Sequence, residues 1–247
     1  MKTLHFGNWL KLSVIALLAL GLFSCSKDDD HNPQVAGLMA FNLASDQPLV
    51  AIALSGNRLA TPLPYTNYTG TYLAIYPGTR SVTSFDANAG STLATDSATF
   101  TSGKYYSLFV TGMHGNYRDI IIADGLDTLR GTAGLSYIRY VNAIADSSHP
   151  VVSIATGDSA ILDQPAVYGE VSPFRAVPAG DILISLSDGG GISSSRTITT
   201  TAQKIYTVLL LGNPASGQTG ADSIQIRYVE NGALTEDTSQ MSAEKID

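Results

Sequence analysis

Apolar and polar residues alternate along much of the chain, which is the pattern of a β-strand with one buried face and one wetted face. The alternation is clearest in SIQIRYV, residues 223–229, where every second residue is apolar. It recurs in DILISLS (181–187) and in KYYSLFVT (104–111). After the first 24 residues no long stretch has the 3.6-residue apolar period of a helix. The pattern therefore predicts an all-β protein.

Turn-forming residues separate the predicted strands at intervals of roughly ten to fifteen residues. Examples are Pro77-Gly78, Pro178 to Gly180 and Asp188 to Gly191. Short strands at this spacing are typical of antiparallel β-sandwiches, including those of immunoglobulin type.

The chain also repeats itself at an offset of about one hundred residues. Residues 36–57 align with 133–158, residues 71–82 with 173–184, and residues 103–112 with 202–212. Three matches that keep their order and spacing indicate two copies of one module. A period this long exceeds that of solenoid repeats, so each copy should be a domain with its own core.

The repeat and a polar, glycine-bearing stretch at 124–134 predict the domain bounds. The first antiparallel β-sandwich is expected at 35–130 (the first copy) and the second at 131–232 (the second copy). From 233 to 247 the chain is polar and acidic, and we expect a frayed tail there.

The first residues have the order of a lipoprotein signal peptide. Lys2 and Lys11 supply positive charge, and an apolar run of about a dozen residues follows, too short to span a bilayer comfortably. Cys25, the only cysteine, comes directly after this run. We therefore expect a signal peptide at 1–24, a tether at 25–34, and acyl chains on Cys25 that anchor the protein in a membrane.

The residues after the cysteine resemble the export signal of lipoproteins in the Bacteroidetes. These are Ser26, Lys27, Asp28, Asp29 and Asp30. The resemblance implies transport to the outer face of the outer membrane. The alternative is a plain solvated tether, because runs of like charge are usually solvated and without a specific role.

Composition narrows the classes of function. Removal of residues 1–24 takes away two lysines and changes the net charge from −7 to −9. An acidic chain lacks the basic footprint of a nucleic-acid-binding protein. With its single cysteine acylated the mature protein would have no disulfide, so core burial must stabilise it.

Two motifs of the second copy resemble the DUF4397 family. They are IRYVNAIADSSHPVVSIATGD (138–158) and YGEVSPFRAVPAGDILISL (168–186). The likeness is close over 133–230 and weaker over 36–125. It implies a secreted or surface β-domain and carries over no active site. Asn142 and Asp146 have a physical reading too, because their side chains suit the capping of the turn between two strands.

Catalytic and metal-binding patterns are sparse. The sequence has no G-x-S-x-G, no H-E-x-x-H and no cysteine cluster. Carboxylates gather at two places without singling out a catalytic pair: Asp119, Asp124 and Asp127, and Asp158, Asp163 and Glu170. We expect no enzyme activity, no cofactor and no metal.

The residues 62–78 hold four tyrosines within a dozen positions: Tyr65, Tyr68, Tyr72 and Tyr76. Exposed tyrosines can stack on sugars or anchor a partner protein. The alternative is that they pack over the sheet edge and the core. A glycan platform requires at least two of them to be exposed on one face.

The function predicted from sequence is a non-catalytic binding or adhesion module, lipid-anchored in the outer membrane and facing the cell exterior. One alternative is a glycan-binding accessory protein of a polysaccharide uptake system. A second alternative is a carboxylate-dependent hydrolase. The expected partners are the membrane and a glycan or protein ligand, without nucleic acid.

Overall fold

The computed structural model describes residues 34–59, 61–146, 148–213, 223–235 and 238–241. The expectations for the signal peptide, Cys25 and Ser26 to Asp30 lie outside these residues. Within the described ranges the structure consists of strands and a single short 3₁₀ turn, Leu126–Thr128. The all-β class predicted from the alternating pattern is confirmed.

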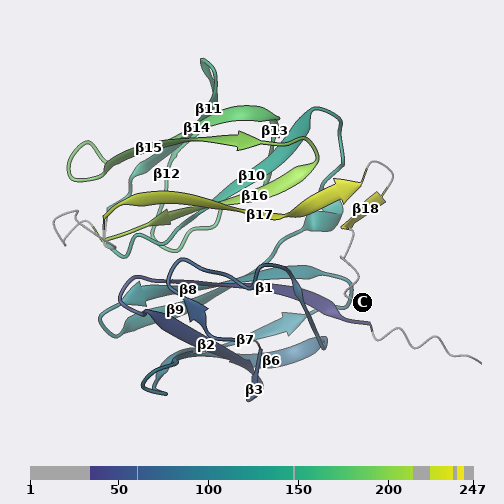
Figure 1. The fold of residues 1–247 in the computed structure, drawn as a ribbon, viewed down its shortest axis with the longest axis vertical. Coiled ribbons are helices and arrows are strands. Elements are labelled where there is room, and N and C mark those ends of the chain that lie inside the picture. Colours follow the sequence, from purple (N-terminus) through teal and green to yellow (C-terminus); the bar gives the residue numbers. More distant parts are fainter. Residues whose placement is uncertain (1–33, 60, 147, 214–222, 236–237, 242–247) are drawn as a thin grey trace, which may run out of the picture. The chain divides into compact units, whose positions relative to one another are not determined.

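The first copy forms two facing sheets (Figure 1). One has the strand order β5-β1-β8-β9, comprising Leu73–Ile75, Ala36–Ala44, Tyr105–Met113 and Asn116–Ala123. The other has the order β3-β2-β6-β7, comprising Asn57–Arg58, Leu49–Leu54, Gly78–Asp86 and Thr92–Phe100, with β4 (Leu63–Pro64) also paired to β2.

The second copy repeats this strand order. One sheet is β13-β10-β16-β17-β18, comprising Arg175–Pro178, Leu135–Asn142, Lys204–Leu211, Gln225–Thr235 and Thr238–Met241. The other is β12-β11-β14-β15, comprising Ser159–Pro165, Val151–Thr156, Gly180–Ser187 and Ser193–Thr200. The two copies thus place equivalent strands at equivalent positions.

The register extends this equivalence to single residues. Leu38 pairs with Tyr106 in the first copy, and Ile138 pairs with Tyr206 in the second. Both hydroxyls accept a backbone N–H from the residue five positions earlier in the chain, at 2.9 Å for Tyr106 and 3.1 Å for Tyr206. The same local tie therefore fixes the entry to β8 and to β16.

Most strand pairs are antiparallel, as expected, but each copy contains one parallel pair. β1 runs parallel to β8, and β10 runs parallel to β16. The chain leaves β1 for the facing sheet and returns to β8 only later, and a connection of that length permits parallel pairing.

Each copy encloses an apolar core between its two sheets. In the first copy this core includes Leu38, Val82 and Leu108, all inaccessible to solvent. In the second copy it includes Ile138, Ile184 and Val208. Burial of each such side chain contributes roughly 1.5–3 kcal/mol. These inward residues are the apolar set of the alternating pattern.

A third apolar cluster joins the two copies. It brings together residues of β1, β8, β10 and β16, namely Met39, Phe41, Leu43, Phe109, Val141, Leu209 and Leu211, and Ala143 directly after β10. These strands are consequently buried on both faces. The expectation that 104–111 has one wetted face is wrong, because the second face of β8 packs against the second copy.

The segment from 233 onward differs from the expected frayed tail. β17 continues to Thr235 and pairs there with β18. Leu234 is buried in a small apolar cluster with Leu126, Leu129 and Ile205. The burial of Leu234 thus stabilises this extension of the sheet.

Candidate functional site

The four tyrosines of residues 62–78 do not form a common exposed surface. Tyr76 is 73% exposed, whereas Tyr65, Tyr68 and Tyr72 are half-buried. Tyr68 stacks on Phe41 with ring centroids 5.4 Å apart. The packing alternative describes Tyr68 well, and the exposure required for a glycan platform is met by one of the four.

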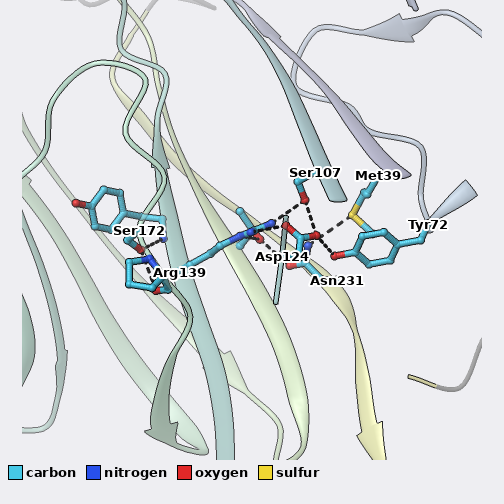
Figure 2. Close-up of polar contacts among 10 residues, drawn as sticks. Met39, Tyr72, Ser107, Asp124, Arg139, Ser172 and Asn231 are labelled. Carbon is cyan, nitrogen blue, oxygen red and sulfur yellow. Dashed lines mark hydrogen bonds and ion pairs between the residues drawn. The ribbon is translucent and has the colours of Figure 1, made fainter. Parts of the chain in front are cut away.

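Tyr72 instead belongs to a buried polar centre between the two copies (Figure 2). Its hydroxyl donates a 2.5 Å hydrogen bond to Asp124 Oδ2, which also accepts from Ser107 Oγ at 2.9 Å. The other carboxylate oxygen of Asp124 accepts from Arg139 Nη1 at 2.7 Å. Burial raises the pKa of Tyr72 well above its usual value, and the Asp124 charge acts in the same direction.

Arg139 connects this centre to the second copy. Its guanidinium also donates to Ser107 Oγ at 2.8 Å and to Thr207 Oγ1 at 3.0 Å. It lies over the Phe174 ring, 4.2 Å from the centroid. The side chain is 1% exposed and that of Asp124 is fully buried, so both charges depend on these partners.

The equivalent positions of the two copies meet in this centre. Thr207 donates to Asn231 Oδ1 at 2.7 Å, and Asn231 Nδ2 lies 3.6 Å from Met39 Sδ. By register Ser107 corresponds to Thr207 and Met39 to Arg139. The buried ion pair and the neutral Met39 and Asn231 thus lie together in one polar cluster between the copies (Figure 2).

A hollow of about 450 Å³ adjoins the buried ion pair. Its lining includes Arg139, Asp124, Phe174 and Leu129. The two charged groups already bind each other and neighbouring hydroxyls, so they leave little for a ligand. We regard this hollow as a consequence of the interface.

The carboxylates considered for hydrolysis occupy unlike environments. Asp119 is buried in the first copy, Asp124 is held by Arg139, and Asp127 pairs with Lys104 at 2.6 Å. Glu170 accepts from the Tyr140 hydroxyl and the Val167 N–H. Among the described residues, no group of three His, Cys, Asp or Glu side chains is placed to hold a metal ion.

Asn142 and Asp146 do act as turn caps. Asn142 Oδ1 accepts the Ile144 N–H at 3.1 Å, and Asp146 Oδ1 accepts the Ser148 N–H at 3.1 Å. Asn42 has the role of Asn142 in the first copy, since its Oδ1 accepts the Ala44 N–H. The structural interpretation of these residues is supported.

An open groove of about 570 Å³ lies along β15 and β17. Its lining residues are Ser195, Arg196, Gln225, Ile226, Arg227 and Tyr228. Arg196 lies over the Tyr228 ring, 5.2 Å from the centroid, and donates to the Ile226 carbonyl at 2.8 Å. The groove thus combines two guanidinium groups with a partly exposed aromatic ring.

Sequence reasoning missed this groove. Every second residue of β15 points between the sheets, as the buried Ile192, Ile198 and Thr200 show. Arg196 occupies such a position and is nevertheless exposed. The sequence did contain a sign of the groove, because Arg196 alternates with the buried Ile198 and Thr200. A charged side chain at such an inward position keeps the edge of the sandwich open to water.

Two sandwiches with matched topology and a joint interface define the class of this protein. Residues 36–149 match the family model described as "Domain of unknown function (DUF4397)", so this part of the chain is similar to that family. The match covers the first copy and the start of the second, whereas the motifs placed the closer resemblance at 133–230. The repeated segments of the sequence account for the likeness in both copies, and the two copies also share their strand order.

Solved structures provide weaker likenesses. One is a family 41 carbohydrate-binding module from streptococcal virulence factors that recognises α-glucan: 14% identity, 73% of this chain, 99% of that chain, TM-score 0.23. Another is a family 26 module from Eubacterium rectale Amy13K bound to maltoheptaose: 9% identity, 78% of this chain, 96% of that chain, TM-score 0.24. No curated protein matches the chain. Superpositions at these TM-scores give no basis for a shared ligand.

The described residues include no helix long and apolar enough to cross a membrane.

Proposed function

We propose that this protein is a non-catalytic binding module, anchored by acyl chains on Cys25 and displayed on the outer surface of the outer membrane. The supporting observation is the groove along β15 and β17, in which charged and aromatic side chains remain open to solvent. Arginine and tyrosine side chains exposed together in a groove are typical of a binding surface.

The structure favours binding over hydrolysis. A glycosidase needs two carboxylates that flank one bond. The groove lining contains none, and the buried carboxylates Asp119 and Asp124 face different environments. Adhesion and glycan capture both fit a non-catalytic groove.

Display and binding are tested together on intact cells that express the full chain. We expect added protease to remove the protein from the cell surface, and the cells to adhere to at least one immobilised polysaccharide or matrix protein. A Cys25→Ser chain should leave the membrane fraction and abolish adhesion. A chain that resists protease on intact cells, or cells that adhere equally with Cys25→Ser, would contradict the proposal.

A further inference from the structure

We propose that the groove between β15 and β17 binds an anionic polysaccharide, whose carboxylate or sulfate groups pair with Arg196 and Arg227 while a sugar ring packs on Tyr228. This assignment rests on the proposed function and names the ligand class of the same groove.

The charge of the groove is opposite to that of the chain. The protein carries a formal net charge of −7, yet the groove lining includes two arginines and no acidic residue. None of the ion pairs found among the described residues includes Arg196 or Arg227. A polyanion is therefore the ligand that these two charges complement.

Both guanidiniums keep donors for a ligand. Each arginine has five N–H donors in a planar fork that matches a carboxylate or sulfate. Arg196 gives one of them to the Ile226 carbonyl. Arg227 gives one to Gln225 Oε1 at 3.1 Å and one to Thr66 Oγ1 at 2.7 Å. These bonds orient the guanidiniums, so less side-chain entropy is lost when an anion binds.

The remaining lining suits a sugar better than a peptide. Tyr228 is 36% exposed and offers the part of its ring that Arg196 does not cover, while Ser195 offers a hydroxyl of the kind that pairs with sugar hydroxyls. Ile226 is the one aliphatic residue in the lining and is 5% exposed. The groove thus has no apolar pocket to anchor peptide side chains.

The first copy lacks this chemistry at the same positions. Arg196 pairs with Ile184 as Asp96 pairs with Val82, four residues after the equivalent Gly180 and Gly78. The positions of Arg227 and Tyr228 opposite β16 correspond to Ile120 and Ile121 opposite β8. Two cations and a ring in one copy therefore replace an acid and two aliphatic residues in the other. The fold does not require the cationic groove.

The test measures binding of the full chain to immobilised polygalacturonate (carboxylate), dextran sulfate (sulfate), neutral dextran and poly-glutamate. We expect binding to one or both anionic polysaccharides, weakened by added salt. Arg196→Gln and Arg227→Gln should each raise Kd roughly tenfold or more. Tyr228→Ala should weaken binding as well. Far-ultraviolet circular dichroism confirms that each variant folds.

Arg175→Gln serves as the control. It removes an exposed arginine from β13, at the opposite edge of the same sheet, and should leave Kd unchanged. Thr66→Ala should weaken binding less than Arg227→Gln does, because it removes one bond that orients the Arg227 guanidinium but keeps the charge.

Equal binding of neutral dextran, or poly-glutamate binding as tightly as the polysaccharides, would overturn the assignment. Unchanged Kd values in the folded groove variants would do the same. If the cells adhere only to a matrix protein and the groove variants keep that adhesion, the assignment of an anionic polysaccharide is contradicted. The proposed function as a binding module would still hold. Absence of both surface display and adhesion removes the proposed function as well.

Discussion

The first copy buries Asp119 and Ser84 where the second copy buries Ile226 and Leu186. The strand register establishes these equivalences, because Asp119 pairs with Val110 as Ile226 pairs with Leu210. Ser84 is inaccessible and Asp119 is 7% exposed, so both polar groups lie in the interior. No hydrogen bond of ordinary geometry reaches either oxygen of Asp119 among the described residues, and the nearby Ser84 only partly offsets the effect of burial on its pKa. One copy thus tolerates a polar defect that the other fills with aliphatic side chains.

The difference continues at the neighbouring edge strand. Asp96 of β7 lies near Asp119, and its negative charge adds to the burial that raises the pKa of Asp119 to about 6. Arg196 of β15 stands at the equivalent position and opens into the cationic groove. The two copies therefore diverge most at the edge formed by β7 and β9 or by β15 and β17, while the topology stays the same.

Other positions are the same in both copies and show what the fold needs. Asn42 and Asn142 each cap the turn after the first strand. Tyr106 and Tyr206 each accept a backbone N–H before the parallel-paired strand. The two asparagines satisfy buried backbone N–H groups, so their replacement by an apolar residue would be costly. The two tyrosines satisfy partly buried N–H groups, so the cost there should be smaller.

The largest effect is expected at the interface between the copies. There Arg139 of the second copy occupies the position that Met39 has in the first. Arg139→Met would leave the buried Asp124 carboxylate without its cation and should lower the free energy of unfolding by about 3–5 kcal/mol. Urea denaturation at neutral pH measures this loss. Adding Asp124→Asn, which copies the neutral Asn231, should recover more than half of it.

An exposed ion pair provides the control for that comparison. Lys104 and Asp127 lie 2.6 Å apart with about half of each side chain exposed (46% and 48%). Lys104→Met should therefore change stability little. Equal losses from Lys104→Met and Arg139→Met, or no recovery in the double variant, would show that the buried charge pair does not hold the copies together.

Asp119→Asn should produce the next largest effect. The folded-state pKa of Asp119, about 6, lies above its ordinary value of 3.8, so the native protein binds the proton more tightly than the unfolded chain. This group therefore lowers stability as pH rises from about 4 to about 6, by about 3 kcal/mol in all. The variant removes that titration.

The measurement is urea denaturation of both proteins at about pH 4 and about pH 7.5. The stability of Asp119→Asn relative to the natural protein should rise by about 3 kcal/mol between the two pH values. Asp163→Asn, at an exposed position of β12, is the matched control and should show no such change. A stability difference that is independent of pH would contradict the assignment of the defect to the carboxylate.

The alternating pattern was sufficient to predict the all-β class, because inward residues such as Ile182 and Ile184 must avoid water in any sandwich, and the three aligned segments predicted the duplication. It could not predict the interface. Phe109 and Leu209 have the apolar character of a core residue, but only the three-dimensional structure shows that they form a second buried face. Arg139 was equally hidden, since a charged residue in an alternating strand is normally assigned to the wetted face.

The candidate site was missed for a related reason. Tyr65 to Tyr76 stand close together in sequence, and that density suggested a binding surface, whereas most of that surface is used in packing. Arg196 and Tyr228 are more than thirty residues apart and meet only because β15 and β17 border the same edge. Local density is a poor guide to a site that two sheets assemble.

The smallest expected change in stability tests whether the equivalent tyrosine hydrogen bonds contribute equally in the two copies. Tyr106→Phe and Tyr206→Phe each remove one hydroxyl and leave the Thr101 or Thr201 N–H without its acceptor. Each should lower the free energy of unfolding by about 1 kcal/mol, and the double variant by about the sum, because the two tyrosines lie in separate cores. Urea denaturation of the three variants measures this. A loss in one copy alone would mean that the shared tie matters to only one sandwich, and a double loss well above the sum would mean that the two positions are coupled.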